Sequence, residues 1–255
     1  MEITKEDKML LAGAEDKYKQ CLDQYRLTYT NFLDIRQRSL VESMVNGIPG
    51  SGKDVRCVFY GGYEDAERTI AVFLPDYADE SECPISVVRA KAPANGRKLT
   101  HRDYLGALMG LGLKREMVGD ILTNERGADI IVMDDIKDFI LLNYSKAGRV
   151  SLQLDEASIS ELIIPERKTV TTRDTVASLR LDNVVSSAFK LSRAKAAEAI
   201  RAGLVFLNSI EAEKTDMQVK EGDKLVLRGK GKAILTEVGG KTRKDRIPVV
   251  IERYM

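Results

Sequence analysis

Apolar residues recur at helical spacing in the charged first 45 residues of the chain, among them Leu22, Tyr25, Tyr29 and the pair 32–33. This period predicts helices. A break that contains Gly and Pro follows at 46–52, and behind it stand two apolar runs of strand length, 55–60 and 69–74. Residues 1–78 are therefore expected to form a small N-terminal domain of helices and a sheet.

A different pattern begins at Ile85. It predicts, in order, a strand at 85–91, a helix at 101–111, strands at 117–122 and 128–133, a helix with Ile136, Phe139, Ile140 and Tyr144 on one face, and an alternating strand at 150–154. The order βαββαβ is typical of a ferredoxin-like domain, which we place at 79–160. Many RNA-binding modules use this fold. The glycine-rich aromatic strand that would stack bases is absent, so base stacking is not expected here.

The stretch 159–178 is polar and contains Pro165, which predicts a linker with an approach strand. A third domain, 180–255, should follow, with Val184, Val185 and Phe189 on the apolar face of its first helix. Ser192 and Gly203 are preferred residue types before and after a second helix, Arg193–Ala202. Strands are expected at 204–208 and 224–228. The predicted fold class is α+β, with three small domains.

The charge of the chain is distributed unevenly. With 255 residues, 44% of them hydrophobic, the chain is long enough to build two or three cores, and its net charge is only +1. From Arg180 onward, however, 16 Lys or Arg stand against 10 Asp or Glu, a balance of +6, whereas residues 1–179 carry 24 against 29, a balance of −5. A basic C-terminal third predicts that this part of the chain binds a polyanion.

The cysteine, histidine and apolar content of the sequence argues against a disulfide-bonded secreted protein, a membrane protein and a metalloprotein. Cys21, Cys57 and Cys83 are widely spaced and form no C-x-x-C pair, which indicates reduced thiols in a cytoplasmic protein. No stretch of about 18 consecutive apolar residues predicts a membrane span. One histidine, without ligands at the usual spacing, predicts no metal site. We expect no cofactor, no small-molecule substrate and, with the oligomeric state left open, a monomer.

The basic C-terminal part contains candidate phosphate-binding residues. Phosphate binding requires fixed cations and N–H donors, and a helix N-terminus flanked by Lys190, Arg193 and Lys195 supplies both. For any one of these cations a solvated helix face is an equally good interpretation, but the set and its local charge favour RNA binding. The helix cations are expected to remain solvated. The candidate RNA-binding residues are Arg180, Lys190, Ser192, Arg193, Lys195, Arg201, Arg228, Lys230, Lys232, Lys241, Arg243 and Lys244. His101 and Arg102 are a candidate second contact, to RNA or to protein.

Five short motifs in this third domain occur in one known module. They are R-L-D at 180–182, S-R-x-x-A at 192–196, I-x-x-G at 200–203, L-V-F-L-N at 204–208 and E-G-D at 221–223. The set closely resembles the S-four-type RNA-binding domain, named after a small-subunit ribosomal protein. Ser209 stands where such hairpins usually place Gly after Asn, which leaves the turn type open.

Further segments extend the resemblance over the whole chain. They are 32–36, 61–68, 99–108, 112–116 and 119–121, and together they resemble the YlmH family of bacterial three-domain proteins, which are encoded near cell-division genes. The resemblance implies binding of rRNA and tRNA on large ribosomal subunits that carry peptidyl-tRNA, in the quality-control pathway that extends stalled chains. It also implies a link to cell division and no catalytic residues.

An RNA-modifying or nucleotide-dependent enzyme is the alternative. Residues 47–53 fit the first seven positions of a phosphate-binding loop, but Asp54 occupies the eighth, where a hydroxyl should ligate magnesium. His101-Arg102-Asp103 resembles the catalytic loop of a kinase, but the other kinase motifs are absent from the sequence. The 180–182 motif also resembles that of pseudouridine synthases, but their catalytic domain follows the small RNA-binding domain, and here only 25 residues follow Lys230. Asp182 is therefore expected in the first turn of a helix.

Overall fold

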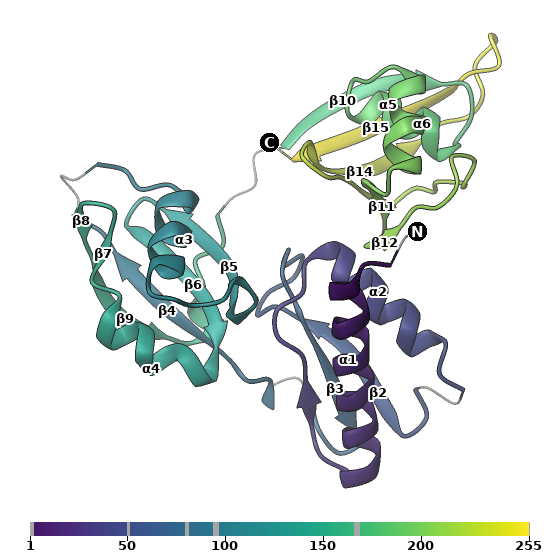
Figure 1. Ribbon diagram of the computed structural model, residues 1–255. Coiled ribbons are helices and arrows are strands. Elements are labelled where there is room, and N and C mark those ends of the chain that lie inside the picture. Colours follow the sequence, from purple (N-terminus) through teal and green to yellow (C-terminus); the bar gives the residue numbers. More distant parts are fainter. Residues whose placement is uncertain (1–2, 50–51, 80–81, 94–96, 166–168, 255) are drawn as a thin grey trace. The chain divides into compact units, whose positions relative to one another are not determined.

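The computed structural model describes residues 3–49, 52–79, 82–93, 97–165 and 169–254 (Figure 1). The chain folds into two compact units, Ile3–Pro165 and Glu166–Met255. Both mix helices with antiparallel sheets, so the predicted α+β class is confirmed. None of the helices in the described ranges combines the length and the apolar character that a membrane span requires.

The first half of the larger unit packs two helices on a small sheet. Helices α1 (Lys5–Gln24) and α2 (Ile35–Asn46) lie beside strands β1 (Thr28–Tyr29), β3 (Ile70–Pro75) and β2 (Val55–Tyr60), in that sheet order (Figure 1). Each helix starts with a capping box, formed by Thr4 with Asp7 and by Asp34 with Gln37. Both strands that the apolar runs predict are present, within one residue of the expected bounds.

The expectation of a continuous helical pattern through residues 22–33 is wrong. Helix α1 ends at Gln24, and Tyr25 adopts a left-handed conformation with a φ of 52°. The chain then runs extended and pairs with β3, where Thr28 faces Phe73. The Thr28 hydroxyl also donates a hydrogen bond to the Lys17 carbonyl, 2.6 Å away. These contacts link residues far apart in the sequence, so a local period cannot reveal them.

The second half of the larger unit has the predicted ferredoxin-like order. Its elements are β4 (Ile85–Lys91), α3 (His101–Gly110), β5 (Val118–Asn124), β6 (Gly127–Met133), α4 (Asp134–Asn143) and β9 (Gln153–Ala157), with the single turn η2 (Arg115–Met117) before β5. The four strands pair antiparallel in the order β5-β6-β4-β9. Helices α3 and α4 bury Tyr104, Leu108 and Ile140 against one face of this sheet, and Tyr144, directly after α4, is buried with them.

The last strand of this half lies further along the chain than predicted. The alternation at 150–154 is split, because β8 (Val150–Ser151) pairs with β7 (Lys146–Ala147) in a separate hairpin. The strand that joins the sheet is β9, whose Leu154 lies opposite Ala90 of β4. The partner strand therefore decides which of these residues belong to the sheet.

The other face of the ferredoxin-like sheet is covered. The backbone N–H of Phe32, in the first half, donates to the Glu116 carbonyl oxygen at 2.8 Å, and Phe32 belongs to a buried cluster that includes Ile131 and Met133 of β6. The segment that contains η3 (Ile159–Glu161) crosses the same face, where the N–H of Ile163 donates to the buried Asp129 carboxylate. Residues 3–165 therefore form one unit, and the boundary between 78 and 79 remains a prediction.

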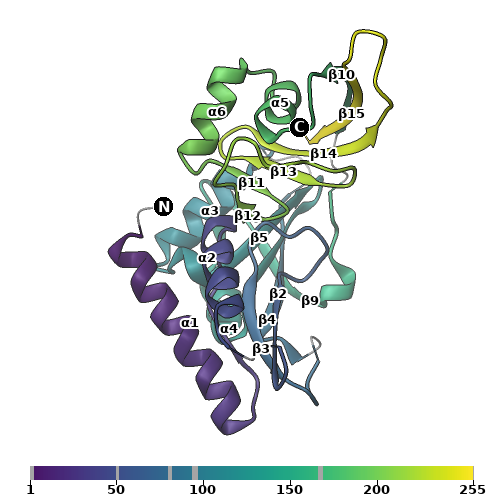
Figure 2. The same cartoon turned by 90° about the vertical axis from the view of Figure 1, so that its right-hand side faces the viewer.

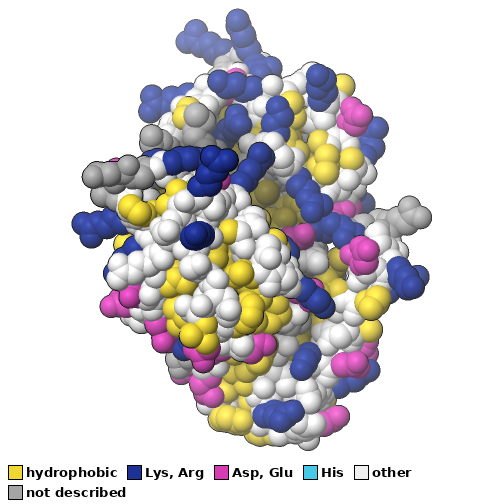
Figure 3. All heavy atoms as spheres, turned by 60° about the vertical axis from the view of Figure 1, so that its left-hand side comes forward, with side chains coloured by type: hydrophobic (Ala, Val, Ile, Leu, Met, Phe, Trp, Pro, Cys, Tyr) yellow, Lys and Arg dark blue, Asp and Glu magenta, His cyan; other side chains and the backbone are white. Residues whose placement is uncertain are grey.

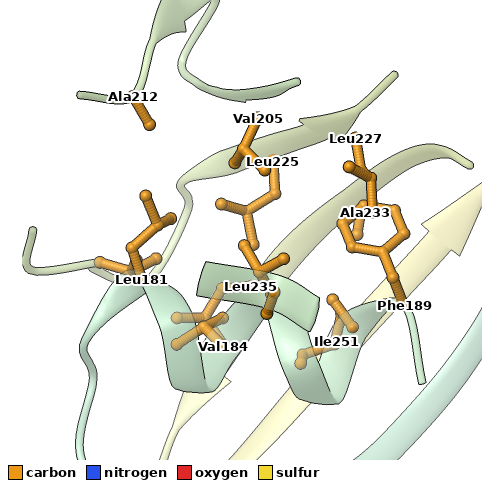
Figure 4. Close-up of a cluster of buried hydrophobic side chains, with 14 of the residues drawn as sticks. Leu181, Val184, Phe189, Val205, Ala212, Leu225, Leu227, Ala233, Leu235 and Ile251 are labelled. Atoms are coloured by element: carbon orange, nitrogen blue, oxygen red, sulfur yellow. The ribbon is translucent and has the colours of Figure 1, made fainter. Parts of the chain in front are cut away.

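The smaller unit places two helices on one face of a six-stranded sheet (Figures 1 and 2). Its elements are β10 (Thr169–Val176), α5 (Leu181–Ala188), α6 (Arg193–Arg201), β11 (Val205–Leu207), β12 (Ile210–Glu211), β13 (Lys224–Leu227), β14 (Gly231–Val238) and β15 (Ile247–Tyr254). The sheet order is β10-β15-β14-β13-β11-β12. Leu181 and Val184 of α5 point toward Leu225, Leu235 and Ile251 of the sheet (Figure 4).

Two details of this unit refine the sequence prediction. The approach strand predicted before residue 180 is β10, which pairs with β15 over its full length, from Thr169 to Val176. Residues 166–168 of the predicted linker lie outside the described residues. Asn208 and Ser209 both have positive φ, 52° and 71°, so the β11–β12 hairpin uses a type I′ turn although Ser replaces Gly.

Candidate nucleic-acid interface

Helix α6 begins and ends as its sequence predicts. The Ser192 hydroxyl accepts a hydrogen bond from the backbone N–H of Lys195 at 3.3 Å, which caps the helix before Arg193. Arg201 is the last helical residue, and Gly203 follows Ala202 with a φ of +67°. This cap holds Arg193 and Lys195 in the first turn, where free backbone N–H groups and the helix dipole favour an anion.

Lys190 stands in the connection between α5 and α6, in a conformation that is rare for a side chain with a Cβ. Its φ is 51°, in the left-handed region. The neighbours hold it there, because the N–H of Leu191 donates to the Ser186 carbonyl at 3.0 Å and the Ser186 hydroxyl donates to the Leu191 carbonyl at 2.7 Å. The exposed side chain of Lys190 therefore starts from a fixed backbone position beside α6.

Arg180 and Arg193 converge on the carboxylate of Asp182. Arg193 places Nε 3.0 Å and Nη2 2.9 Å from Oδ2, and Arg180 donates from Nε to Oδ1 at 3.2 Å and from Nη2 to Oδ2 at 3.3 Å. Desolvation raises the pKa of the Asp182 carboxyl, but the hydrogen bonds from the two guanidinium groups outweigh it and hold the pKa below its ordinary value. Arg193 is thus ion-paired as well as solvated, which corrects the expectation of a purely solvated side chain.

A cleft of about 490 Å³ lies between β10 and the helices. Its cations are Lys190, Arg193 and Arg246, and polar side chains such as Asn183 and Ser187 share the lining with the carboxylate of Asp174. Sequence reasoning missed Arg246, although it ends the same basic segment as Lys241, Arg243 and Lys244. Arg246 donates to both the hydroxyl and the carbonyl oxygen of Thr175, which fixes the end of that segment against β10.

The remaining predicted residues fall into two further groups. Arg228, Lys230 and Lys232 lie at the β13–β14 turn, whereas Lys241, Arg243 and Lys244 lie in the β14–β15 connection, which projects from the unit in Figures 1 and 2. The eight residues of β14 separate these groups by about 23 Å at the rise of a β-strand. Arg201 stands about 12 Å along α6 from Arg193. Lys and Arg side chains crowd the C-terminal unit in the upper part of Figure 3.

His101 and Arg102 lie in the other unit. They are exposed at the start of α3, where Thr100 and Asp103 form the predicted capping box. Desolvation lowers the pKa of His101, and the charge of Arg115 lowers it further. Arg102 is an exposed cation that this helix start offers to a partner.

The loop that resembles a phosphate-binding motif has the predicted context. Helix α2 ends at Asn46 before the loop, and strand β2 begins at Val55 after it, so no helix N-terminus follows the glycines. Residues 50–51 of the loop lie outside the described part of the chain. In the ranges that the structure describes, no three His, Cys, Asp or Glu side chains are grouped to hold a metal ion.

The C-terminal unit places two helices on an antiparallel sheet, with cations at the start of the second helix, and its match to the S4 family model identifies the chain as an RNA-binding protein with a C-terminal S-four-type domain. Residues 179–225 match the family model described as "S4 domain", and residues 78–161 match the model described as "Putative RNA-binding domain in YlmH". The "Ribosome-associated protein quality control protein P2" of Bacillus subtilis (strain 168) is 37% identical over 233 residues, which cover 91% of this chain and 89% of the relative. The chain belongs to the YlmH family.

A solved structure supports the fold. The "Cell division protein ylmH from Streptococcus pneumoniae" aligns with a TM-score of 0.52 and 24% identity, covering 65% of this chain and 98% of that chain. At this identity the similarity shows the fold alone. The resemblance stated from the sequence motifs is confirmed by these matches together with the two family models.

Proposed function

We propose that this protein binds structured rRNA and tRNA on large ribosomal subunits that carry peptidyl-tRNA, as part of quality control of stalled translation. The observation that carries the proposal is the pairing of Arg180 and Arg193 around Asp182, next to a capped helix start, within the basic C-terminal unit. The name of the Bacillus subtilis relative, a ribosome-associated quality-control protein, supports the ribosomal setting.

The spacing of the cations favours a structured RNA. Arg180 and Arg193 lie close enough together to bind one phosphate. The two groups of cations at the ends of β14, by contrast, are about 23 Å apart. One RNA contacts all of them only when its backbone phosphates are held across that distance. Binding through phosphates fixes position and makes the affinity dependent on salt, with little information from base sequence.

The covered sheet favours a different role for the ferredoxin-like half. Base stacking needs an open sheet face, and the first half of the unit and the segment around η3 occupy that face here. Arg102 at the start of α3, with His101 beside it, is our candidate for a second contact. Its partner is either RNA or a protein. The proposed link to cell division rests on membership of the YlmH family.

A non-enzymatic role is supported by the state of Asp182. A nucleophilic or acid–base carboxylate must reach a substrate, whereas Asp182 is 4% exposed and its oxygens accept hydrogen bonds from two arginines. For the nucleotide-dependent alternative, the helix–loop–strand order around residues 47–53 offers phosphates no helix N-terminus.

The test is sedimentation of the full-length protein with separated ribosomal subunits, with and without peptidyl-tRNA. We expect co-sedimentation with the large subunit, strengthened by peptidyl-tRNA and weakened by salt. A hydrolysis assay with ATP and GTP runs in parallel, with Lys53→Ala as its control. Equal binding to both subunits contradicts the assignment to the large subunit, and hydrolysis that is lost in Lys53→Ala supports the enzymatic alternative.

A further inference from the structure

Asp182 is a buried carboxylate in the first turn of α5, held by long-range backbone pairing. Its N–H donates to the Thr215 carbonyl at 3.0 Å, and the preceding Leu181 N–H donates to the Met217 carbonyl at 2.8 Å. Arg180 forms an antiparallel bridge with Gln218. The carboxylate is therefore placed by two segments of the C-terminal unit, and its position does not depend on the long side chains that bind it.

The two arginines differ from Asp182 in exposure. The side chain of Arg193 is 57% exposed and that of Arg180 is 37% exposed, whereas that of Asp182 is 5% exposed. Each guanidinium directs Nε and Nη2 at the carboxylate, and Nη1 makes no hydrogen bond within the described residues. One edge of each planar group is thus held by the protein, and donors remain on the solvent side, the arrangement that a phosphate oxygen requires.

We propose that Asp182 is a positioning residue for RNA binding, which holds Arg180 and Arg193 as one pre-oriented pair of phosphate-binding groups. A free arginine loses side-chain freedom when it binds a phosphate, and this loss weakens the complex. When Asp182 already holds both guanidinium groups, most of that loss occurs on folding. The inference rests on the proposed function, because it assigns Asp182 a role at the same surface.

Net charge makes the opposite prediction, which gives a sharp test. Asp182→Asn keeps the shape of the side chain and removes a negative charge from an RNA-binding surface. If charge alone set the affinity, the variant would bind RNA more tightly. The positioning role predicts about tenfold weaker binding, because Asn offers one oxygen to two guanidinium groups and both arginines gain freedom.

The experiment titrates labelled full-length protein with purified large ribosomal subunits over a range of salt concentrations. The variants are Asp182→Asn, Arg193→Gln, Arg180→Gln and the double variant that combines Asp182→Asn with Arg193→Gln. Arg193→Gln should weaken binding and make the slope of log K against log salt shallower by about 0.7–0.9, as one lost phosphate contact requires. Asp182→Asn should weaken binding with little change of slope. In the Arg193→Gln background it should have a clearly smaller effect, because one of its two partners is gone.

The outcomes separate this inference from the proposed function. If Arg193→Gln and Arg180→Gln both leave the affinity unchanged, this surface does not bind RNA, and the observation on which the proposed function rests is refuted. If these variants lose affinity while Asp182→Asn binds as well as the wild type or better, the positioning role alone is wrong. Should Asp182→Asn unfold, Arg193→Lys takes its place, since it keeps the charge and loses the fork, and unchanged affinity in that variant overturns the inference.

Discussion

Replacing Lys195 with Glu separates RNA affinity from stability. Lys195 is the third residue of α6, is exposed, and has its backbone N–H bound to the Ser192 hydroxyl. A Glu at this position completes the Ser-x-x-Glu capping box, because its carboxylate can accept the N–H of Ser192. It also places a negative charge at the positive end of the helix dipole. We expect the variant to be more stable than the wild type, by about 0.5–1 kcal/mol.

The same change should weaken RNA binding. One phosphate contact contributes about 0.9 to the slope of log K against log salt. If the contact adds nothing to the affinity at 1 M salt, it therefore raises the affinity about eightfold at 0.1 M. The corresponding factors are about fifteen at 0.05 M and about four at 0.2 M. Lys195→Ala should lose about this much, and Lys195→Glu should lose more, because its carboxylate repels the phosphate.

The assay combines titration with large ribosomal subunits at three salt concentrations and unfolding in urea. The matched control is Lys17→Glu, which makes the same charge change at an exposed position of α1, in the acidic part of the chain. A stable Lys195→Glu variant with unchanged affinity and salt slope removes this helix start from the RNA interface. Equal losses in both variants show instead that affinity follows net charge without regard to position.

Four further outcomes follow from the structure. Phe32→Ala should destabilise the Ile3–Pro165 unit by about 3–5 kcal/mol in urea unfolding, because the ring is 1% exposed and packs between its two halves, and a loss below about 1 kcal/mol contradicts this packing. Gly127→Ala should prevent β4–β6 pairing, because a Cβ would lie 1.9 Å from the Ala90 carbonyl oxygen, and a native circular dichroism spectrum and unfolding midpoint refute this. A hydrogen bond from Arg36 holds the pKa of Asp7 well below its ordinary value; Asp7→Asn should therefore cost about 2 kcal/mol at neutral pH, and the difference should shrink as the pH falls below about 4 but remain partly present at about pH 2, because the folded carboxyl is protonated only at lower pH, whereas a difference that stays constant with pH excludes the ion pair as its cause. A fragment from residue 166 onward should fold alone and retain most salt-sensitive RNA binding, and stronger binding by residues 1–165 contradicts the assignment of the interface.

Local patterns in the sequence determined most elements and the class of the protein. The start of α6 at Ser192 and the glycine that follows its end depend on residues a few positions apart, so they can be read from sequence alone. The βαββαβ order and the sign change of the charge at residue 180 are also properties of the linear chain. The two family resemblances rest on such short motifs.

Only the tertiary structure decided which residues meet. Helix α1 ends early because Thr28 pairs with Phe73, and β9 joins its sheet opposite β4, 62 or more positions away along the chain. The ion pairs of Asp182 depend on the fold of the α5–α6 connection, which brings Arg193 back to the start of α5. Such contacts join segments that no local period connects, and for this reason the sequence predicted the cations of the proposed interface and the helical position of Asp182, but not the ion pairs between them.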